Sequence, residues 1–213
     1  FKMGDQVRIS IVTVTYNSID HIAQCLNSVE EQSYNEIEHI VIDGASTDGT
    51  QEFLISNRKR FSIYVCEPDQ GIYDALNKGF ALATGDIVGI LHSDDTYSDS
   101  SVLQTVSVAF ATSAADYVYG GVKMLNSEGK VVRNWRSGVL PSGKIRSEQI
   151  PHPSIFLSRA LVNKLNPVFD TTYRISADLK QQLIFANTLN CRGFYIPQTL
   201  VNMKIGGTST ANL

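Results

Sequence analysis

The segment Ile9-Ser10-Ile11-Val12-Thr13-Val14-Thr15 is rich in β-branched residues and too short for a helix. It therefore predicts a buried strand of a parallel sheet. Tyr16-Asn17-Ser18 follows, and either Asn17 or Ser18 is expected to cap a helix. That helix carries one apolar stripe, whose members recur at helical spacing: Ile19, Ile22, Leu26 and Val29.

The same order of strand and helix repeats through the first 113 residues. Strands are predicted at 37–43, 62–67 and 87–91, and helices at about 50–60, 73–83 and 101–111. Strand–helix units of this length imply an α/β fold with a parallel sheet and right-handed crossovers.

The second half has a different pattern. Two strands, 116–126 and 130–135, flank Ser127-Glu128-Gly129 and predict a hairpin. The stretch 137–153 is rich in Gly, Pro, Ser and basic residues and predicts a long mobile loop. A short strand at 154–157, a helix at 177–186, a strand at 193–196 and a flexible tail complete the chain.

Length and composition are those of one globular domain. The 213 residues are 43% hydrophobic and 18% charged, which predicts a single domain over 1–213 with halves at 1–113 and 114–213. A net charge of −3 argues against a nucleic-acid partner. Three widely spaced cysteines form neither a disulfide framework nor a CxxC metal pattern, so a cytoplasmic location is expected.

Polar side chains gather where the predicted parallel strands end. The ends carry Thr15-Tyr16-Asn17, then Asp43, then Glu67-Pro68-Asp69-Gln70-Gly71, then Ser93-Asp94-Asp95. Ligands of open α/β sheets bind at the carboxyl ends of the strands. The sequence therefore predicts one polar crevice at this edge.

Ser93-Asp94-Asp95, the acidic turn, is the most distinctive of these segments. Adjacent carboxylates repel each other unless they are solvated or bound to a cation. Their oxygens suit Mg²⁺ or Mn²⁺, with phosphate oxygens and waters completing the coordination. The alternative is that Asp94 and Asp95 are turn residues ahead of the helix at Ser101.

Asp43 and Tyr16 also have two interpretations each. The Asp43 carboxylate could accept a hydrogen bond from a nucleotide base, or it could form an Asx turn with Gly44. Ser46-Thr47-Asp48 could meet an anion through its backbone amides, or merely cap the next helix. Tyr16 could stack on a base or be packed against the protein.

Four segments together resemble glycosyltransferase family 2, in the family's order and at similar spacing. They are Ser10-Ile11-Val12-Thr13-Val14-Thr15-Tyr16-Asn17, Ile40-Val41-Ile42-Asp43-Gly44-Ala45-Ser46-Thr47-Asp48-Gly49-Thr50, Glu67-Pro68-Asp69-Gln70-Gly71-Ile72-Tyr73-Asp74-Ala75-Leu76-Asn77-Lys78-Gly79 and Ala83-Thr84-Gly85-Asp86-Ile87-Val88-Gly89-Ile90-Leu91-His92-Ser93-Asp94-Asp95. The resemblance implies a GT-A fold, a Rossmann-like and mostly parallel sheet flanked by helices, with a small antiparallel acceptor-side portion in the second half.

The resemblance also implies transfer of a sugar from a nucleotide donor, most simply a UDP-sugar, with Mn²⁺ or Mg²⁺. The acidic turn then corresponds to the DXD motif, with Asp95 as the preferred metal ligand and Asp94 beside it. The residues implied to bind the nucleotide are Thr15, Tyr16, Asn17, Asp43, Ser46, Asp69, Gly71, Lys78, Ser93 and Asp94. Two positions depart from the family pattern, since His92 replaces an Asp or Asn and Leu76 replaces an Arg.

In the second half, Arg174-Ile175-Ser176-Ala177-Asp178-Leu179-Lys180 resembles the family segment whose Asp deprotonates the acceptor. The residues alone allow another interpretation, in which Asp178 complements the dipole of a helix. His152 and Arg174 are candidates for contact with the acceptor or a phosphate. For His152, which lies between Pro151 and Pro153, the alternative is an ordinary loop residue. The resemblance implies an inverting transfer to a saccharide or lipid-linked saccharide in cell-surface polysaccharide or lipopolysaccharide assembly, with possible contact at the inner membrane face.

Three other functions are compared with this one. A sugar-phosphate nucleotidyltransferase would need a Gly-rich loop after the first strand, and Tyr16-Asn17-Ser18-Ile19-Asp20 has no Gly. A dinucleotide-binding oxidoreductase would need G-x-G-x-x-G at the same place. A non-catalytic nucleotide-sugar-binding protein stays open because of the departures at His92 and Leu76.

Overall fold

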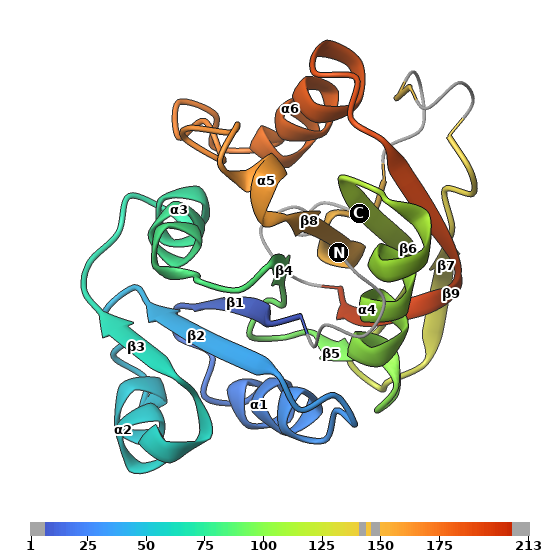
Figure 1. Ribbon diagram of the computed structural model, residues 1–213. Coiled ribbons are helices and arrows are strands. Elements are labelled where there is room, and N and C mark those ends of the chain that lie inside the picture. Colours follow the sequence, from blue (N-terminus) through green and yellow to red (C-terminus); the bar gives the residue numbers. More distant parts are fainter. Residues whose placement is uncertain (1–6, 141–143, 146–149, 206–213) are drawn as a thin grey trace.

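The computed structural model describes residues 7–140, 144–145 and 150–205. Within these residues one mixed sheet has nine strands, in the order β3-β2-β1-β4-β8-β6-β9-β5, with β7 paired to β6 (Figure 1). The sheet runs from one side of the molecule to the other, and helices cover both of its faces. Strand β4 of the first half pairs with β8 of the second, so the two halves share one sheet.

The first half supplies the parallel part of the sheet. Its strands are β1 (Ile9–Thr15), β2 (Ile37–Asp43), β3 (Ile63–Cys66) and β4 (Ile87–Ile90). All pairings among them are parallel, and Thr15 lies opposite Asp43, which lies opposite Cys66. The predicted strands are confirmed, and their carboxyl ends lie at one edge of the sheet.

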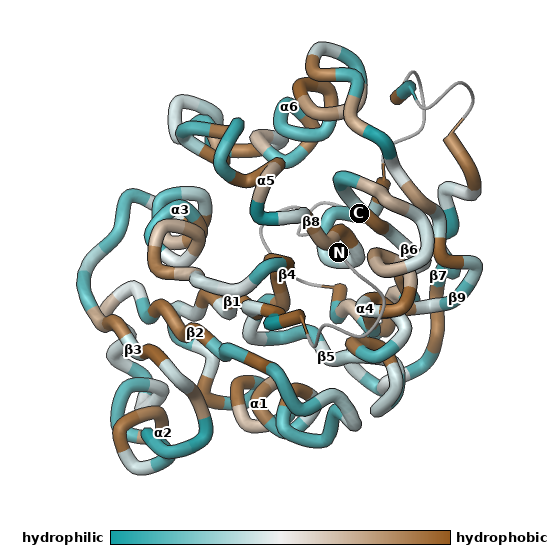
Figure 2. The backbone as a smooth tube through the Cα atoms, viewed as in Figure 1, coloured by the Kyte–Doolittle hydropathy of each residue, from teal (hydrophilic) through white to brown (hydrophobic). Residues whose placement is uncertain are grey.

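The helices are α1 (Ile22–Glu30), α2 (Thr50–Ser56), α3 (Ile72–Leu82), α4 (Val102–Ser113), α5 (Arg159–Val162) and α6 (Ala177–Leu183). Short 3-10 turns lie at Arg58–Arg60 and His152–Ser154, and a π-helical turn at Ile184–Thr188 continues α6. One hydrophobic cluster packs α3, α5 and α6 on one face of the sheet, and a second packs α1 and α4 on the other. Along the helices, hydrophobic and hydrophilic residues intermingle, as amphipathic packing requires (Figure 2).

The predicted cap of the first helix is wrong. Helix α1 begins at Ile22, and the Ser18 carbonyl accepts hydrogen bonds from the amides of His21 and Ile22, both at 2.9 Å. Asn17 is in the left-handed region with φ 50°, and its amide is bonded to Ser46. The loop after β1 is therefore hydrogen-bonded to the loop after β2, and it does not continue directly into α1.

The second half is confirmed in outline and corrected in detail. The hairpin of β6 (Tyr117–Leu125) and β7 (Val131–Trp135) and the short strand β8 (Ile155–Ser158) lie where predicted. Strand β9 (Gly193–Lys204) is much longer than predicted, because it continues past Pro197 with a register shift opposite β6. The two-residue strand β5 (Thr96–Tyr97) was not predicted.

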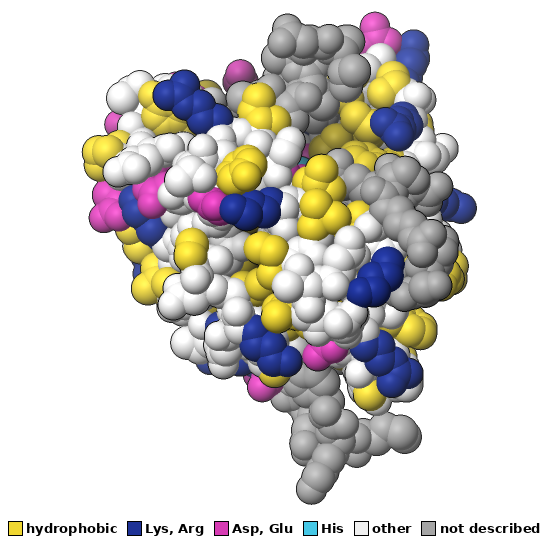
Figure 3. Space-filling view, turned by 90° about the horizontal axis from the view of Figure 1, so that it is seen from above, with side chains coloured by type: hydrophobic (Ala, Val, Ile, Leu, Met, Phe, Trp, Pro, Cys, Tyr) yellow, Lys and Arg dark blue, Asp and Glu magenta, His cyan; other side chains and the backbone are white. Residues whose placement is uncertain are grey.

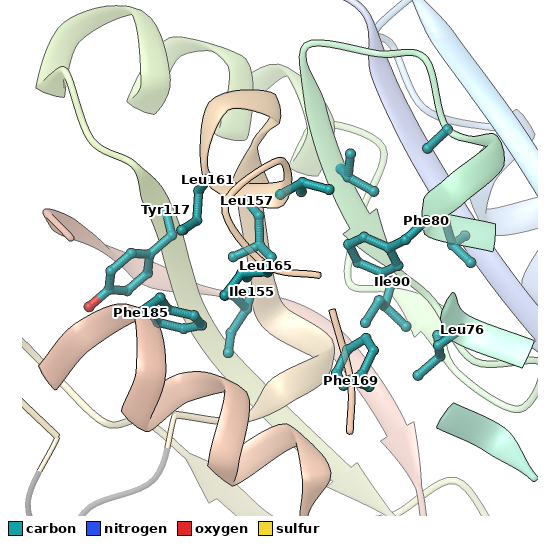
Figure 4. Close-up of a cluster of buried hydrophobic side chains, with 14 of the residues drawn as sticks. Leu76, Phe80, Ile90, Tyr117, Ile155, Leu157, Leu161, Leu165, Phe169 and Phe185 are labelled. Carbon is teal, nitrogen blue, oxygen red and sulfur yellow. The ribbon is translucent and has the colours of Figure 1, made fainter. Parts of the chain in front are cut away.

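Close packing fixes α3 over the centre of the sheet. A Cβ atom on Gly79 would lie 2.2 Å from Val12 Cγ1, so α3 approaches β1 more closely than any larger residue allows. Hydrophobic side chains fill the same layer, where Phe80, Ile90 and Phe169 lie together (Figure 4). This contact holds the first turn of α3 near the edge of the sheet that carries the polar residues.

The predicted loop at 137–153 is only partly described. Its described residues Leu140, Ile145 and Ile150 are buried, and the Ile145 amide donates to Asn187 Oδ1 at 3.0 Å. These residues therefore anchor the segment against the core. The tail from Gly206 lies outside the described residues.

Candidate active site

The loops after β1 and β2 hold each other through side-chain hydrogen bonds. The Asn17 amide donates to Ser46 Oγ at 2.8 Å, and the Thr47 amide donates to Asn17 Oδ1 at 2.8 Å. Ser46 Oγ in turn donates to Asp43 Oδ1 at 2.5 Å. Asn17, Asp43 and Ser46 are thereby brought together, as expected for one edge of the sheet.

Asp43 is fully buried beneath these loops. Its Oδ1 accepts from Ser46, and its Oδ2 faces Tyr64 Oη at 3.4 Å and Cys66 Sγ at 3.3 Å. Burial, followed by the Cys66 hydrogen bond and the Asp43 charge, raises the pKa of the Tyr64 hydroxyl. Since protein donors meet both carboxylate oxygens, Asp43 shapes the loop that follows β2. Its contact with a nucleotide stays a prediction.

The side chains of Tyr16 and Asp69 lie on either side of Gly44, whose backbone carries no side chain between them. The Tyr16 side chain is 63% exposed. A Cβ on Gly44 would lie 2.5 Å from Asp69 Oδ2 and 3.4 Å from Tyr16 Cδ2, so only glycine leaves this arrangement undisturbed. The Gly71 amide, with φ 112°, donates to Asp69 Oδ1 at 2.8 Å and fixes the carboxylate. An exposed ring beside a fixed carboxylate suits a flat heterocycle that carries an N–H.

Lys78 is already paired within its own loop. Its Nζ lies 2.9 Å from Glu67 Oε1 and 3.3 Å from Asp74 Oδ2, and it donates to the Pro68 carbonyl at 3.2 Å. The Glu67 hydrogen bond, with that of Asp74, raises the pKa of Lys78. Lys78 therefore braces the β3–α3 loop, and its contact with a diphosphate stays a prediction.

The acidic turn places its two carboxylates differently. Asp95 is 1% exposed, and its Oδ1 is buried without a hydrogen-bond partner among the described residues. Burial, with the charge of Asp94, raises the pKa of Asp95 well above its usual value. Asp94 is half-buried, and Ser93 Oγ donates to Ser18 Oγ at 2.9 Å. Asp94 is thus the more accessible of the two predicted metal ligands.

Within residues 7–140, 144–145 and 150–205, no group of three or more His, Cys, Asp or Glu side chains is arranged to hold a metal ion. Mg²⁺ sites beside phosphates typically use only one or two carboxylates and several waters. An accessible Asp94 next to the unpartnered oxygen of Asp95 fits that donor set. Thr15 Oγ1 is a further buried oxygen without a partner in the described part of the chain.

A short chain of polar contacts, the histidine bridge (His92, His152 and Asp178), joins the two halves of the protein. His92 Nε2 lies 3.1 Å from His152 Nε2, and His152 Nδ1 lies 3.3 Å from Asp178 Oδ2. Tyr73 Oη donates to Asp178 Oδ1 at 3.1 Å. The predicted base therefore lies two contacts away from the strand end that carries the acidic turn.

Both imidazoles of the bridge favour the neutral form. Burial lowers the pKa of His92 to about 3, and the neighbouring His152 adds to this effect. Burial also lowers the pKa of His152, while the Asp178 carboxylate opposes it. Asp178 itself is buried at the start of α6, whereas Arg174 is exposed on the preceding loop.

The sequence reasoning missed Tyr73, Tyr64 and the participation of His92. Tyr73 stands in the first turn of α3, two residues after the positive-φ Gly71, and this spacing was the available signal. Tyr64 and Cys66 are two residues apart on β3, so their side chains lie on the same face of the strand. Both contact Asp43 from that face. The approach of His92 to His152 has no local signal.

Basic side chains are spread over the face seen in Figure 3 rather than gathered in one patch. No helix in the described part of the chain is both long and apolar enough to cross a membrane.

Known proteins match both the sequence and the fold. Residues 10–175 match a family model described as Glycosyl transferase family 2. An uncharacterized glycosyltransferase of Mycobacterium tuberculosis is 33% identical over 219 residues, which cover 95% of this chain and 77% of that relative. A PGL/p-HBAD biosynthesis glycosyltransferase of Mycobacterium bovis is 30% identical over 174 residues, covering 79% of this chain and 66% of the relative.

Two solved structures are similar in fold. Residues 1–349 of Staphylococcus aureus TarS in complex with UDP superpose with a TM-score of 0.76 at 20% identity, covering 93% of this chain and 61% of that one. The mannosyltransferase PcManGT of Pyrobaculum calidifontis, in complex with GDP-Man and Mn²⁺, gives a TM-score of 0.72 at 18% identity, covering 98% of this chain and 60% of that one. The predicted GT-A fold is confirmed, and this chain spans about 60% of the length of these structures.

Proposed function

Because the chain belongs to glycosyltransferase family 2, we propose that it transfers a sugar from a nucleoside diphosphate donor to a hydroxyl acceptor, with inversion at the anomeric carbon. The observation that carries this proposal is the histidine bridge. Through it, Asp178 of the second half lies close to the strand end that carries the acidic turn of the first. A base and a diphosphate-binding group on one site are what a single in-line displacement needs.

The donor nucleotide binds across the ends of β1, β2 and β3. Tyr16 stacks on the base, and the fixed carboxylate of Asp69 accepts a hydrogen bond from a base N–H. A uridine nucleotide is the first choice, because TarS binds UDP and UDP-GlcNAc, although PcManGT binds GDP-Man. Thr15, Asn17, Ser46 and Ser93 line the same edge and bind the ribose and diphosphate.

A divalent cation, Mn²⁺ or Mg²⁺, would be held by Asp94, with Asp95 behind it. When bound, it supplies positive charge that offsets the negative charge of the departing diphosphate. Asp94 takes the leading role because it is accessible, whereas Asp95 is buried. The sequence-based preference for Asp95 is thereby reversed in this proposal.

Asp178 accepts the proton of the acceptor hydroxyl as that oxygen attacks the anomeric carbon. The bond from this carbon to the diphosphate oxygen breaks on the opposite face. Tyr73 and His152 each reach one oxygen of Asp178, and they hold the carboxylate in place during the attack. Correct placement contributes more than base strength here, because an ordinary aspartate is a weak base.

The acceptor is a saccharide or lipid-linked saccharide of cell-surface glycoconjugate assembly, and it binds on the side of α6. The similarity to a glycosyltransferase of PGL/p-HBAD biosynthesis supports a role in the assembly of a glycoconjugate. Tyr173, Arg174 and Ile175 are exposed just before α6 and lie beside the proposed base in sequence. Such an acceptor places the reaction at the cytoplasmic face of a membrane.

The test combines a donor screen with one substitution. Nucleotide sugars are screened by thermal shift with and without Mn²⁺, since a true donor raises the melting temperature with concentration. Asp178→Asn is then expected to lower kcat by about 10²–10⁴-fold, the usual contribution of a positioned base, while UDP affinity stays within twofold. A wild-type rate in Asp178→Asn would exclude Asp178 as the base.

Asp99→Asn is the matched control. Asp99 is an exposed carboxylate before α4, where its Oδ1 accepts from the Ser101 amide at 2.8 Å. If Asp178 served only the helix dipole, both variants would lose similar stability and neither would lose the transfer rate.

A further inference from the structure

The contacts of the histidine bridge point to one proton arrangement. A carboxylate can only accept, so a proton on the 3.3 Å contact between His152 Nδ1 and Asp178 Oδ2 is carried by His152. A neutral imidazole carries one proton, and His152 Nε2 is therefore bare and must accept. The proton of the Nε2···Nε2 contact, 3.1 Å long, then belongs to His92.

The other nitrogen of His92 agrees with this arrangement. With its proton on Nε2, His92 has a bare Nδ1, and this atom is buried without a partner among the described residues. A buried N–H without a partner is rarer and costlier than an unpaired acceptor. The opposite tautomer of His92 would bury such an N–H.

Asp178 is held from two sides by elements far apart in the sequence. Tyr73 on α3 donates to one carboxylate oxygen, and Nδ1 of His152, in the 3-10 turn before β8, lies 3.3 Å from the other. These two contacts, one to each oxygen, therefore restrict the plane of the carboxylate.

We propose that His152 is a positioning residue, whose Nδ1–H orients the Asp178 carboxylate toward the acceptor hydroxyl while the Nε2–H of His92 locks the ring in that tautomer. This inference rests on the proposed function, in which Asp178 is the base. Both ring nitrogens of His152 are engaged within the protein, so His152 does not bind the phosphate or the acceptor directly. The role assigned here differs from the one predicted from the sequence.

Three substitutions at one position separate the two ring nitrogens. Asn places its amide N–H near the position of Nδ1, whereas Gln places it near Nε2 and Ala provides neither. Hydrolysis of UDP-glucose, UDP-GlcNAc and GDP-mannose with Mn²⁺ is measured as release of the nucleoside diphosphate, with water in place of the acceptor. We expect His152→Ala and His152→Gln to lower kcat at least tenfold and His152→Asn to stay within threefold of wild type.

UDP affinity in Mn²⁺, measured by calorimetry, distinguishes positioning from phosphate binding. It should stay within twofold of wild type in all three variants. A tenfold loss of UDP affinity in His152→Ala, equal losses of kcat in the Asn and Gln variants, or full activity in all three would each overturn the inference. Tyr73→Phe, which removes the other donor, should lower kcat by about two- to fivefold with the same unchanged affinity.

The tautomers can be read without any substrate. Long-range ¹H–¹⁵N spectra of the wild-type chain at pH 7.5 should show His152 protonated at Nδ1 and His92 at Nε2. The reverse pattern in an active chain would overturn the inference and leave the proposed function intact. The expected tautomers in a chain that hydrolyses no donor would instead overturn the proposed function.

Discussion

Two buried carboxylates near opposite ends of the parallel strands differ in how many donors meet them. Glu38, near the amino end of β2, accepts from Ser10 Oγ at 2.5 Å and from the Thr84 amide and hydroxyl at 2.7 and 2.6 Å. Asp95, after β4, has an oxygen without a partner in the described part of the chain and lies next to Asp94. The two residues are almost equally inaccessible, at 4% and 1% exposure.

Although both carboxyl groups are buried, their pKa values shift in opposite directions at the two ends of the strands. Burial alone would raise the pKa of Glu38, but the hydrogen bonds from Ser10 and Thr84 outweigh it and the pKa is lowered. No comparable set of donors meets Asp95, so burial raises its pKa. Donors within the chain therefore meet the carboxylate at the amino end, whereas at the carboxyl end one oxygen of Asp95 has no partner in the described part of the chain.

The largest expected effect concerns binding at the carboxyl end. Asp94→Ala should weaken UDP binding in Mn²⁺ by about 100-fold, or about 2.7 kcal/mol, and leave the melting temperature unchanged within error. Without metal, the variant and the wild type should bind UDP equally. Calorimetry with and without Mn²⁺ checks this, and equal affinities in Mn²⁺ would exclude Asp94 as a ligand.

The next effect concerns stability at the amino end. Glu38→Gln replaces an acceptor by an amide and breaks bonds from Ser10 and Thr84, which should lower the free energy of unfolding by about 2 kcal/mol at pH 7. Since the folded pKa of Glu38 is lowered, its contribution exists above the unfolded pKa, about 4.3, and is lost as the pH falls below it. Urea unfolding at pH 7 and pH 4 measures both. UDP affinity that fell with stability would contradict the separation of the two ends.

Asp95→Asn should change the free energy of unfolding in the opposite direction to Glu38→Gln. A carboxyl whose folded pKa is raised binds more protons when folded, so its ionisation destabilises the fold as the pH rises. Removing that charge should raise the free energy of unfolding at pH 7 by about 1 kcal/mol in metal-free buffer. Parallel urea titrations of Asp95→Asn and Glu38→Gln make the comparison direct. A loss of stability in both variants would mean that stabilising hydrogen bonds meet the Asp95 carboxylate as they meet that of Glu38.

The smallest effect is a pH dependence away from the site. His39 on β2 is buried, its Nε2 lies 2.9 Å from Thr13 Oγ1, and burial, with the charge of Arg60, lowers its pKa to about 3. Between this value and the unfolded pKa of about 6.5, the unfolded chain binds the extra proton, so stability falls as the pH falls. His39 should contribute a loss of about 0.7 kcal/mol between pH 7 and pH 6. Urea unfolding of His39→Gln should show a shallower pH slope; an unchanged slope would contradict the assignment.

Local patterns predicted much of the fold because their causes are local. The β-branched run of β1, the strand β2 and the helix α3 are confirmed, with boundaries shifted by at most one residue. The extension of β9 past Pro197 was missed, because only pairing with β6 sustains a strand there. The start of α1 was wrong for a similar reason, since Asn17 is held by Ser46, 29 residues away.

The sequence by itself determined which polar groups stand at the strand ends, because strand period and chain order fix which residue ends each strand. Only the tertiary structure decided which of those groups face outward and which already have partners. It buried Asp95 while leaving Asp94 accessible, paired Lys78 with Glu67, and joined His92 to His152 and Tyr73 to Asp178 across 60 and 105 residues. Contacts at such separations depend on strand order and on the packing of α3 and α6, for which no local pattern contains a signal.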